Sequence, residues 1–286
     1  MHLPDGILQN ATCPVTLTIG AGGMALAAYA ALKSEDKPTL GKFAATTSML
    51  FAAQMVNITV LPGVSAHLIG GIAAIALLGL PFGVLSLGLL VAIQALVFGD
   101  GGIMAYGANV LNMALVGSVL PYLAWKRISS RNSAPVMALL AAVGVLLATT
   151  ALAVELGISG HLTAASLATL FKVHTAFALL EAGITAALVY ALASRTATME
   201  SPALHWSLAL TLIVIAPFKS AQPDGLEYTG SLFGFAERAL PSWSLIGDYA
   251  WGSMPALAVM LSGLMGALLI VAASAAVKKA SNLLPE

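Results

Sequence analysis

The chain has 286 residues, of which 59% are hydrophobic and only 8% are charged, and its mean hydropathy is +0.94. These values exclude an ordinary water-soluble domain and indicate an integral membrane protein. The 12 basic and 12 acidic side chains balance, so the chain offers no bulk positive field for nucleic acid. The single cysteine, Cys13, excludes a disulfide within the chain.

The chain start, Met1 to Gly6, contains no basic residue, and the first Lys or Arg is Lys33. A signal peptide begins with a positively charged region, so we expect this chain start to be retained. Retention would leave the α-amine of Met1 free beside the amide and the imidazole of His2. These three groups form one short chelating unit.

This unit suits a divalent transition metal. The α-amine, the deprotonated amide nitrogen of His2 and Nδ1 of its ring can close adjacent chelate rings and occupy three corners of a square plane. Square-planar nitrogen coordination favours Ni(II) or Cu(II). A histidine at position two can also be accidental, and the motif alone leaves that alternative open. Pro4, Asp5 and Gly6 are turn residues that can fold the chain start back into a bundle, where Asp5 can orient an imidazole.

Hydropathy predicts nine apolar segments, because a membrane-spanning helix needs about 20 mostly apolar residues and Gly, Pro and charge clusters mark the gaps. The third and fourth segments are short and are separated by Leu80 and Pro81, so they form either a tight hairpin or a broken, partly re-entrant pair. The segments are 13–32, 43–61, 66–80, 82–99, 103–125, 134–158, 166–193, 203–218 and 255–277. The predicted fold is an all-α polytopic membrane protein with about nine transmembrane helices.

The basic residues predict the orientation, because cytoplasmic loops are enriched in Lys and Arg. An outer N-terminus and a cytoplasmic C-terminus place most of these residues on the cytoplasmic side of a bacterial or archaeal cell membrane. The residues that agree are Lys33, Lys37, Lys42, Lys126, Arg127, Arg131, Arg195, Lys278 and Lys279, and the exceptions are Lys172, Lys219 and Arg238. The chain start then lies outside, where a scavenged metal would arrive.

His67 is the candidate for the fourth nitrogen of the square plane. It lies at the predicted outer start of segment 66–80, on the same side of the membrane as Met1. A lone histidine at a membrane edge is also commonly a hydrogen-bonded structural residue, so spacing alone does not decide its role.

Several polar residues are candidates to support the ligands. Gln94, Asp100 and Asn109 flank the turn at residues 99–102, where they would either orient His2 or His67 or cap a loop. Asn57 falls inside segment 43–61, where an amide must find a partner. Ser65 precedes His67 in the same string. All of these are predicted to lie near the metal rather than to bind it.

His174 and Glu181 are seven residues apart in segment 166–193, so they share one helix face. Ionisable residues inside membranes are costly and often functional. A proton relay and a structural hydrogen-bonded pair are both open interpretations.

Four unusual strings follow one another along residues 1 to about 195. They are MHLPDGIL at the start, MVNITVLPGVSAHLIGG from Met55, IQALVFGDGGIMAYGANVLNMALVG from Ile93, and HTAFALLEAGITAALV from His174. Together they resemble the CbiM/NikM family, the cobalt/nickel substrate-capture component of energy-coupling-factor transporters. The resemblance implies a metal held by the amine of Met1, the amide and ring of His2, and His67.

A second resemblance concerns the C-terminal part. Residues 223–227 read PDGLE, similar to the motif of the small NikN/CbiN accessory subunit, although that family usually continues with Trp and this chain has Tyr228. The resemblance implies a seven-helix capture domain, residues 1–198, fused to an accessory domain, residues 199–286, with two helices and an outer loop.

The expected function is capture of Ni(II) or Co(II) as the transported substrate, without enzymatic activity. The sequence has no G-x-x-x-x-G-K-[ST] loop, so ATP hydrolysis would reside in separate ATP-binding cassette ATPases joined through a transmembrane coupling subunit. The resemblance favours nickel over cobalt, because the accessory domain is fused to the capture domain. A self-contained proton-coupled permease is the alternative. A metalloenzyme is disfavoured because H-E-x-x-H is absent and four nitrogens leave no in-plane position for a catalytic water.

Overall fold

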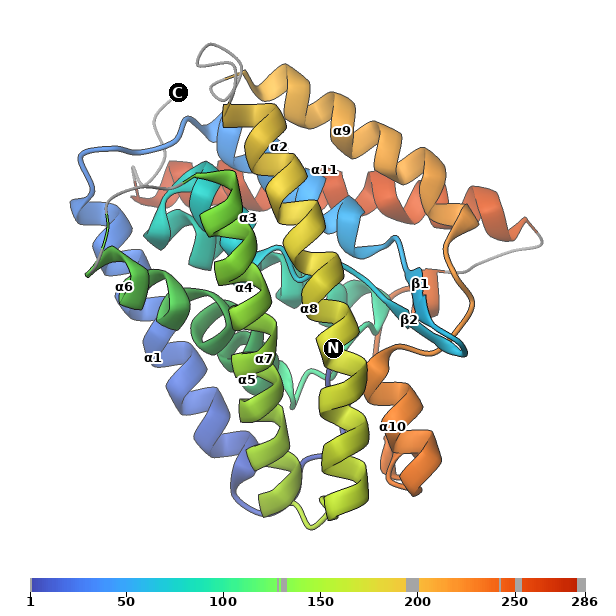
Figure 1. Cartoon of the computed structure of the whole chain (residues 1–286). Helices are drawn as coiled ribbons and strands as arrows, with labels where there is room; N and C mark the ends of the chain where they lie inside the picture. Colours follow the sequence, from blue (N-terminus) through green and yellow to red (C-terminus); the bar gives the residue numbers. More distant parts are fainter. Residues whose placement is uncertain are drawn as a thin grey trace.

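The computed structural model describes residues 2–127, 129, 133–193, 201–241, 243–249 and 254–281. Met1, Arg131 and Arg195, which the sequence analysis singles out, lie outside these described residues. Within them the chain is a bundle of helices with one small two-stranded hairpin (Figure 1). The predicted all-α polytopic membrane fold is confirmed.

The described residues of the N-terminal part form eight α-helices. The first half contains α1 (Thr12–Lys33), α2 (Leu40–Gln54), β1 (Ile58–Leu61), β2 (Val64–Ala66), α3 (Gly71–Leu78) and α4 (Leu80–Ile93), which continues as the π-helix η1 (Gln94–Phe98). The second half contains α5 (Tyr106–Asn109), the π-helix η2 (Val110–Val119), α6 (Leu120–Lys126), α7 (Ala134–Ile158) and α8 (Ala164–Ala193). α5, η2 and α6 follow without a break, so they form one irregular helix.

The hairpin corrects the prediction for residues 43–80. Helix α2 ends at Gln54, and β1 pairs with β2 in antiparallel fashion, with Thr59 opposite Ser65. The β-branched run Ile58-Thr59-Val60 followed by a turn at Gly63, whose φ is +80°, favours strands. Hydropathy missed this because β-branched residues are as apolar as helix formers. His67 therefore lies on the loop between β2 and α3, and α3 has only 8 residues.

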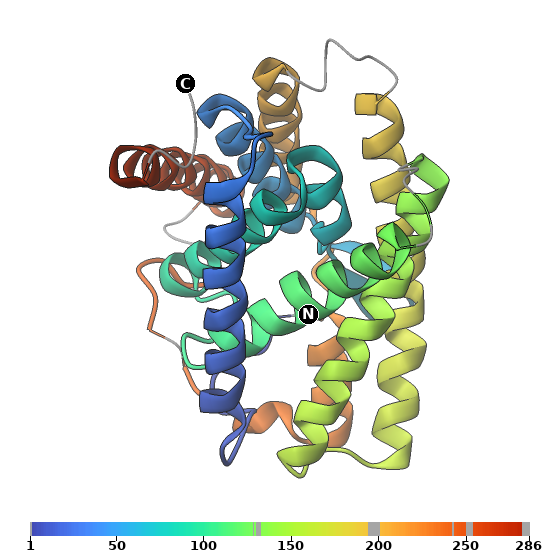
Figure 2. The ribbon, with the colours of Figure 1, turned by 90° about the vertical axis from the view of Figure 1, so that its left-hand side faces the viewer.

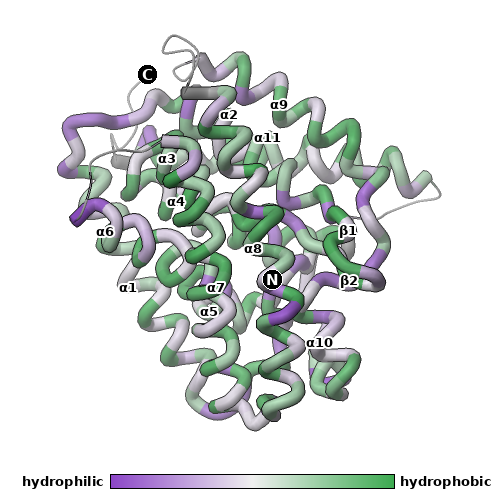
Figure 3. The backbone as a smooth tube through the Cα atoms, in the orientation of Figure 1, coloured by the Kyte–Doolittle hydropathy of each residue, from purple (hydrophilic) through white to green (hydrophobic). Residues whose placement is uncertain are grey.

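Six described helical stretches are long and apolar enough to cross a membrane. They are Thr12–Lys33, Leu80–Phe98, Tyr106–Lys126, Ala134–Ile158, Ala164–Ala191 and Pro255–Ala280. Helices α2, α3 and α9 (Pro202–Ile215) match the other three predicted segments but are shorter. Figure 3 shows hydrophobic residues along the helices, with hydrophilic residues gathered in the connecting loops.

The C-terminal part adds α9, the 3-10 turn η3 (Ala216–Phe218), α10 (Gly225–Phe233), the short turns η4 (Ala236–Arg238) and η5 (Gly247–Tyr249), and α11 (Pro255–Ser281). Helices α9 and α11 both pack on α2, and α11 lies at a steep angle to α1, α7 and α8 (Figures 1 and 2). Helix α10 was not predicted. Asp224 and Glu227 form a capping box at its start, a signal present in the PDGLE string.

Close backbone packing holds the bundle together. A Cβ atom on Gly144 of α7 would collide with the carbonyl oxygen of Gly117 in η2, so only glycine permits this approach. Small residues have this role in membrane helix pairs, where van der Waals contact replaces the hydrophobic effect. Phe51, Phe82 and Phe98 fill the interior and are at most 1% exposed. This packing provides rigid walls for the loops described next.

Candidate metal site

The chain start lies in the interior of the protein. His2, Leu3 and Ile7 are all buried. Asn109 clamps the backbone of Leu3 on both sides: its Oδ1 accepts from the Leu3 amide at 2.7 Å, and its Nδ2 donates to the Leu3 carbonyl at 3.1 Å. The amide of Gly102 also donates to that carbonyl, at 2.8 Å. Asn109 therefore fixes the residue next to His2.

Asp5 anchors the same segment from its other end. Its carboxylate accepts hydrogen bonds from the amides of Ile103, at 3.1 Å, and Ala105, at 3.0 Å. Its carbonyl accepts from the amide of Leu240 at 2.7 Å. Asp5 thus ties the chain start to the turn before α5 and to the C-terminal part, and its predicted action on an imidazole stays a prediction.

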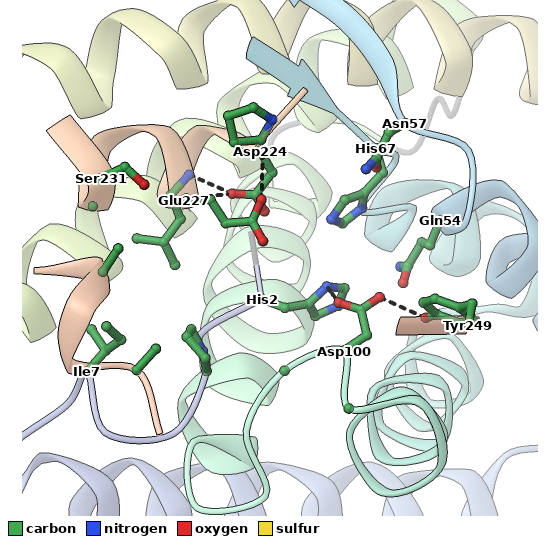
Figure 4. Close-up of a pocket in the computed structure, with 18 of the residues that line it drawn as sticks. His2, Ile7, Gln54, Asn57, His67, Asp100, Asp224, Glu227, Ser231 and Tyr249 are labelled. Atoms are coloured by element: carbon green, nitrogen blue, oxygen red, sulfur yellow. Dashed lines mark hydrogen bonds and ion pairs between the residues drawn. The ribbon is translucent and has the colours of Figure 1, made fainter. Parts of the chain in front are cut away.

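The imidazoles of His2 and His67 face each other. Their ring centroids are 5.0 Å apart with 9° between the ring planes, and their residues are 8% and 7% exposed. One ring comes from the chain start and the other from the loop after β2, and both line a cavity of about 570 Å³ (Figure 4). The fold has brought together the two histidines that the sequence analysis paired.

The ring of His67 is prepared to act as a ligand through Nε2. Its Nδ1 lies 3.0 Å from the carbonyl oxygen of Leu68, and because a carbonyl only accepts, Nδ1 carries the proton. Burial lowers the pKa of His67 to about 3, so the ring is neutral near pH 7. The lone pair then resides on Nε2, as metal coordination requires.

Asp100 lies beside His2. Its Oδ1 is 3.1 Å from Nδ1 of His2, and its Oδ2 accepts from the hydroxyl of Tyr249 at 2.7 Å. Burial alone would raise the pKa of Asp100, but the charge and hydrogen bond of His2, together with Tyr249, hold it well below its usual range. The nitrogen expected to bind metal therefore faces a carboxylate here. Chelation through Nδ1 requires His2 to exchange this contact for the ion.

The other predicted supporting residues have different partners. Gln94 donates to Oε1 of Gln54 at 2.8 Å, and Gln54 in turn donates to the carbonyl of Ile69 at 2.7 Å, so Gln94 reaches the His67 loop through a second amide. The amide of Ser65 donates to the carbonyl of Pro223 at 2.8 Å. Asn57 lines the cavity but follows α2 rather than lying inside a helix, which corrects the prediction.

His174 and Glu181 do not form the hydrogen-bonded pair considered above. Seven residues of helix rise about 10 Å, which is too far for direct contact. Nδ1 of His174 bonds the carbonyl of Leu170 at 2.8 Å, whereas the carboxylate of Glu181 accepts from the amides of Ile69 and Gly70.

Sequence reasoning missed several polar residues that line the cavity, among them Gln54, Asp224 and Tyr249. An amide inside an apolar segment was a usable signal for Gln54. Asp224 caps α10 by accepting from the amides of Leu226 and Glu227. Tyr249 lies in a stretch without periodicity, so no sequence pattern pointed to it.

Among the described residues, no three His, Cys, Asp or Glu side chains gather as a metal-binding group. Two facing imidazoles need further donors to complete a coordination sphere, and the chelate hypothesis takes these from the main chain.

The family model described as the cobalt uptake substrate-specific transmembrane region, CbiM, matches residues 2–199. The chain belongs to the CbiM family. Membership makes it a membrane component of metal transport.

The relatives of this CbiM-family chain are also transport proteins. A protein of Archaeoglobus fulgidus, provisionally named a fused nickel transport protein NikMN, is 30% identical over 95% of this chain and 96% of its own length. The fused nickel transport protein NikMN of Rhodobacter capsulatus is 38% identical over 42% of this chain and 35% of its own length. A crystal structure titled as a truncated transition metal transporter aligns with a TM-score of 0.60 and 33% identity, over 68% of this chain and 99% of that one.

Proposed function

We propose that this chain captures Ni(II) or Co(II) at the outer face of the membrane for an ATP-driven energy-coupling-factor importer. The ion would be held in a square plane by the amine of Met1, the amide and ring of His2, and the ring of His67. The observation that carries this proposal is the facing pair of buried imidazoles at 5.0 Å. A metal–nitrogen bond is about 2 Å long, so the separation of the rings suits one shared ion, and binding would require His2 to turn its Nδ1 away from Asp100.

Nickel is the favoured substrate. A square plane of four nitrogens suits Ni(II) better than it suits Co(II), which commonly takes other geometries. Cu(II) also accepts a square plane, so geometry alone does not exclude it. The names of the Archaeoglobus and Rhodobacter relatives support nickel, while the family description names cobalt uptake.

Energy for transport would come from partner subunits. The sequence contains no phosphate-binding G-x-x-x-x-G-K-[ST] loop, so we assign ATP hydrolysis to ATP-binding cassette ATPases joined through a transmembrane coupling subunit. The basic residues of the loops support an outer N-terminus and a cytoplasmic C-terminus. Metal uptake that is undiminished without the ATPases would instead favour a self-contained permease.

We also propose a division into a capture domain, residues 1–198, and an accessory domain, residues 199–286. The family model ends at residue 199, which supports this boundary. Two contacts between the parts, Tyr249 with Asp100 and Ser65 with Pro223, suggest that the accessory domain helps to shape the cavity.

The test is to acetylate the amine of Met1 and to measure Ni(II) affinity of the purified full chain by titration calorimetry. Acetylation removes the amine as a ligand while both histidines remain, so high-affinity binding should be lost. His67→Ala should weaken binding strongly. His205→Ala is a matched control, because His205 is buried on α9 and bonds the carbonyl of Ser201 away from the cavity. Parental affinity in the acetylated protein would refute the chelate.

A further inference from the structure

Glu181 is a buried acidic residue that the proposed capture of metal does not yet use. It lies on α8, one of the helices long enough to cross the membrane, and is 4% exposed. Placing a carboxylate in such a helix costs several kcal/mol unless it is well satisfied, and an apolar residue of similar volume would be cheaper for stability alone. Its hydrogen bonds therefore call for an explanation.

Both carboxylate oxygens of Glu181 are bound to one short stretch of backbone. Oε2 accepts from the amide of Ile69 at 2.7 Å, and Oε1 accepts from the amide of Gly70 at 2.8 Å. Hydrogen bonds from backbone amides to a carboxylate are about twice as strong as neutral ones. Glu181 thus binds the backbone immediately before α3.

This stretch is the continuation of the loop that carries His67. Only Leu68 separates His67 from Ile69, and the carbonyl of Leu68 accepts the proton of the His67 ring. The carbonyl of Ile69 accepts a hydrogen bond from Nε2 of Gln54 in α2, at 2.7 Å. Gly70 takes a left-handed φ of +77°, so the loop has its own preferred bend at this point. The carboxylate of Glu181 and the side-chain amide of Gln54 together anchor this loop at Ile69 and Gly70.

We propose that Glu181 is a positioning residue for His67: through the amides of Ile69 and Gly70 it sets the height and direction of the His67 ring over the cavity. The inference rests on the proposed role of His67 in binding metal. Because Glu181 belongs to a long membrane helix, the position of α8 and that of the His67 ring are mechanically linked.

The decisive variant is Glu181→Gln. Glutamine has nearly the same shape, but its NH₂ group is a donor and cannot accept a hydrogen bond from a backbone amide. The variant therefore loses one of the two bonds from Ile69 and Gly70, and two donor groups face each other in its place. We expect Ni(II) affinity of the full chain to fall roughly 10–100-fold, the usual loss when the support of a metal ligand is removed. The visible absorption band of the bound ion should shift as well, because the ring meets the ion at a changed angle. Lost stability alone would not move that band.

Glu155→Gln provides the matched control. Glu155 is also 4% exposed, lies on the neighbouring helix α7, and accepts from Nδ2 of Asn112 at 2.7 Å, away from the His67 loop. This variant should keep the parental affinity and the parental band, even if its melting temperature falls.

Parental affinity and band in a folded Glu181→Gln variant would overturn the inference. If that variant does not fold, Glu181→Asp decides the matter: it keeps the charge on a shorter arm and should give a smaller loss with a shifted band, whereas parental values would overturn the inference. His67→Ala in the same assay separates the two levels. If His67→Ala binds Ni(II) like the parent, the proposed metal site itself is refuted. If His67→Ala loses Ni(II) binding while Glu181→Gln keeps the parental affinity and band, only the positioning role of Glu181 is refuted.

Discussion

The two histidines reach the cavity on segments that are held in different ways. The backbone of the chain start, residues 2–8, is bound by Asn109, by the turn at Gly102 and by Leu240 of the C-terminal part. The loop at residues 67–70 is continuous with β2 and α3 and is bound by side chains of α2 and α8. The segment of His2 is thus bound by both parts of the chain, whereas residues 67–70 are bound by two helices of the N-terminal part.

This difference has a functional side. His2 depends on the C-terminal part through the Leu240 bond to Asp5 and the Tyr249 bond to Asp100. The loop of His67 is bound by helices of the N-terminal part, and β2 just before it is also bonded to the C-terminal part through Ser65. Changes in the accessory region should therefore reach both histidines, His2 through Asp5 and Asp100, and His67 through Ser65.

Asn109→Leu should give the largest effect among changes outside the ligands. It removes both side-chain bonds to Leu3 in a site that is 0% exposed, and leaves polar backbone groups to find new partners, at about 1–3 kcal/mol for each group left unsatisfied. We expect a large loss of Ni(II) affinity with a lower melting temperature.

Asn10→Gly is the control for Asn109. Asn10 has a φ of +58°, which glycine adopts readily, and its amide makes one long bond of 3.4 Å to the carbonyl of Ile158. Near-parental binding is expected in a titration of this variant. Equal losses in the two variants would mean that the chain start is held as a whole rather than by the Asn109 clamp.

Tyr249→Phe should give an intermediate effect. It deletes the hydroxyl that bonds Asp100 while keeping the ring stacked on Phe98, whose centroid is 4.5 Å away. Asp100 would then be held less firmly beside Nδ1 of His2. Because that nitrogen must leave Asp100 to bind the ion, Ni(II) affinity should rise, by up to roughly tenfold for the loss of one hydrogen bond. Tyr106→Phe, which removes a 3.1 Å bond to the carbonyl of Gly88, serves as the control. If Tyr249→Phe binds nickel like the parent, the accessory region does not influence His2 by this route.

Ser65→Ala should give the smallest effect. Its hydroxyl donates to the carbonyl of Gln222 at 2.6 Å, and loss of such a bond costs about 1 kcal/mol. The backbone bond from Ser65 to Pro223 remains, so the His67 loop should stay in place and Ni(II) affinity should change little. Limited proteolysis should show faster cleavage near residue 222. A strong loss of metal binding would instead tie Ser65 to the site itself.

Sequence patterns predicted the apolar helices and paired His2 with His67, because both signals are local: a run of apolar residues, and a histidine beside a chain end or in a distinctive string. The hairpin at residues 58–66 escaped because apolarity does not separate strand from helix over so few residues. The partners of Glu181 and Asn109 also escaped. Their hydrogen bonds join residues more than 100 positions apart, and only the three-dimensional packing determines such pairs.

The C-terminal bonds to the chain start have a consequence for biosynthesis. A ribosome makes residues 2–8 before it makes Leu240 and Tyr249, so the surroundings of His2 become complete only after these C-terminal residues have been added. A nascent chain arrested after α8 would lack both contacts, and the closing of the cavity would serve as the last step of assembly.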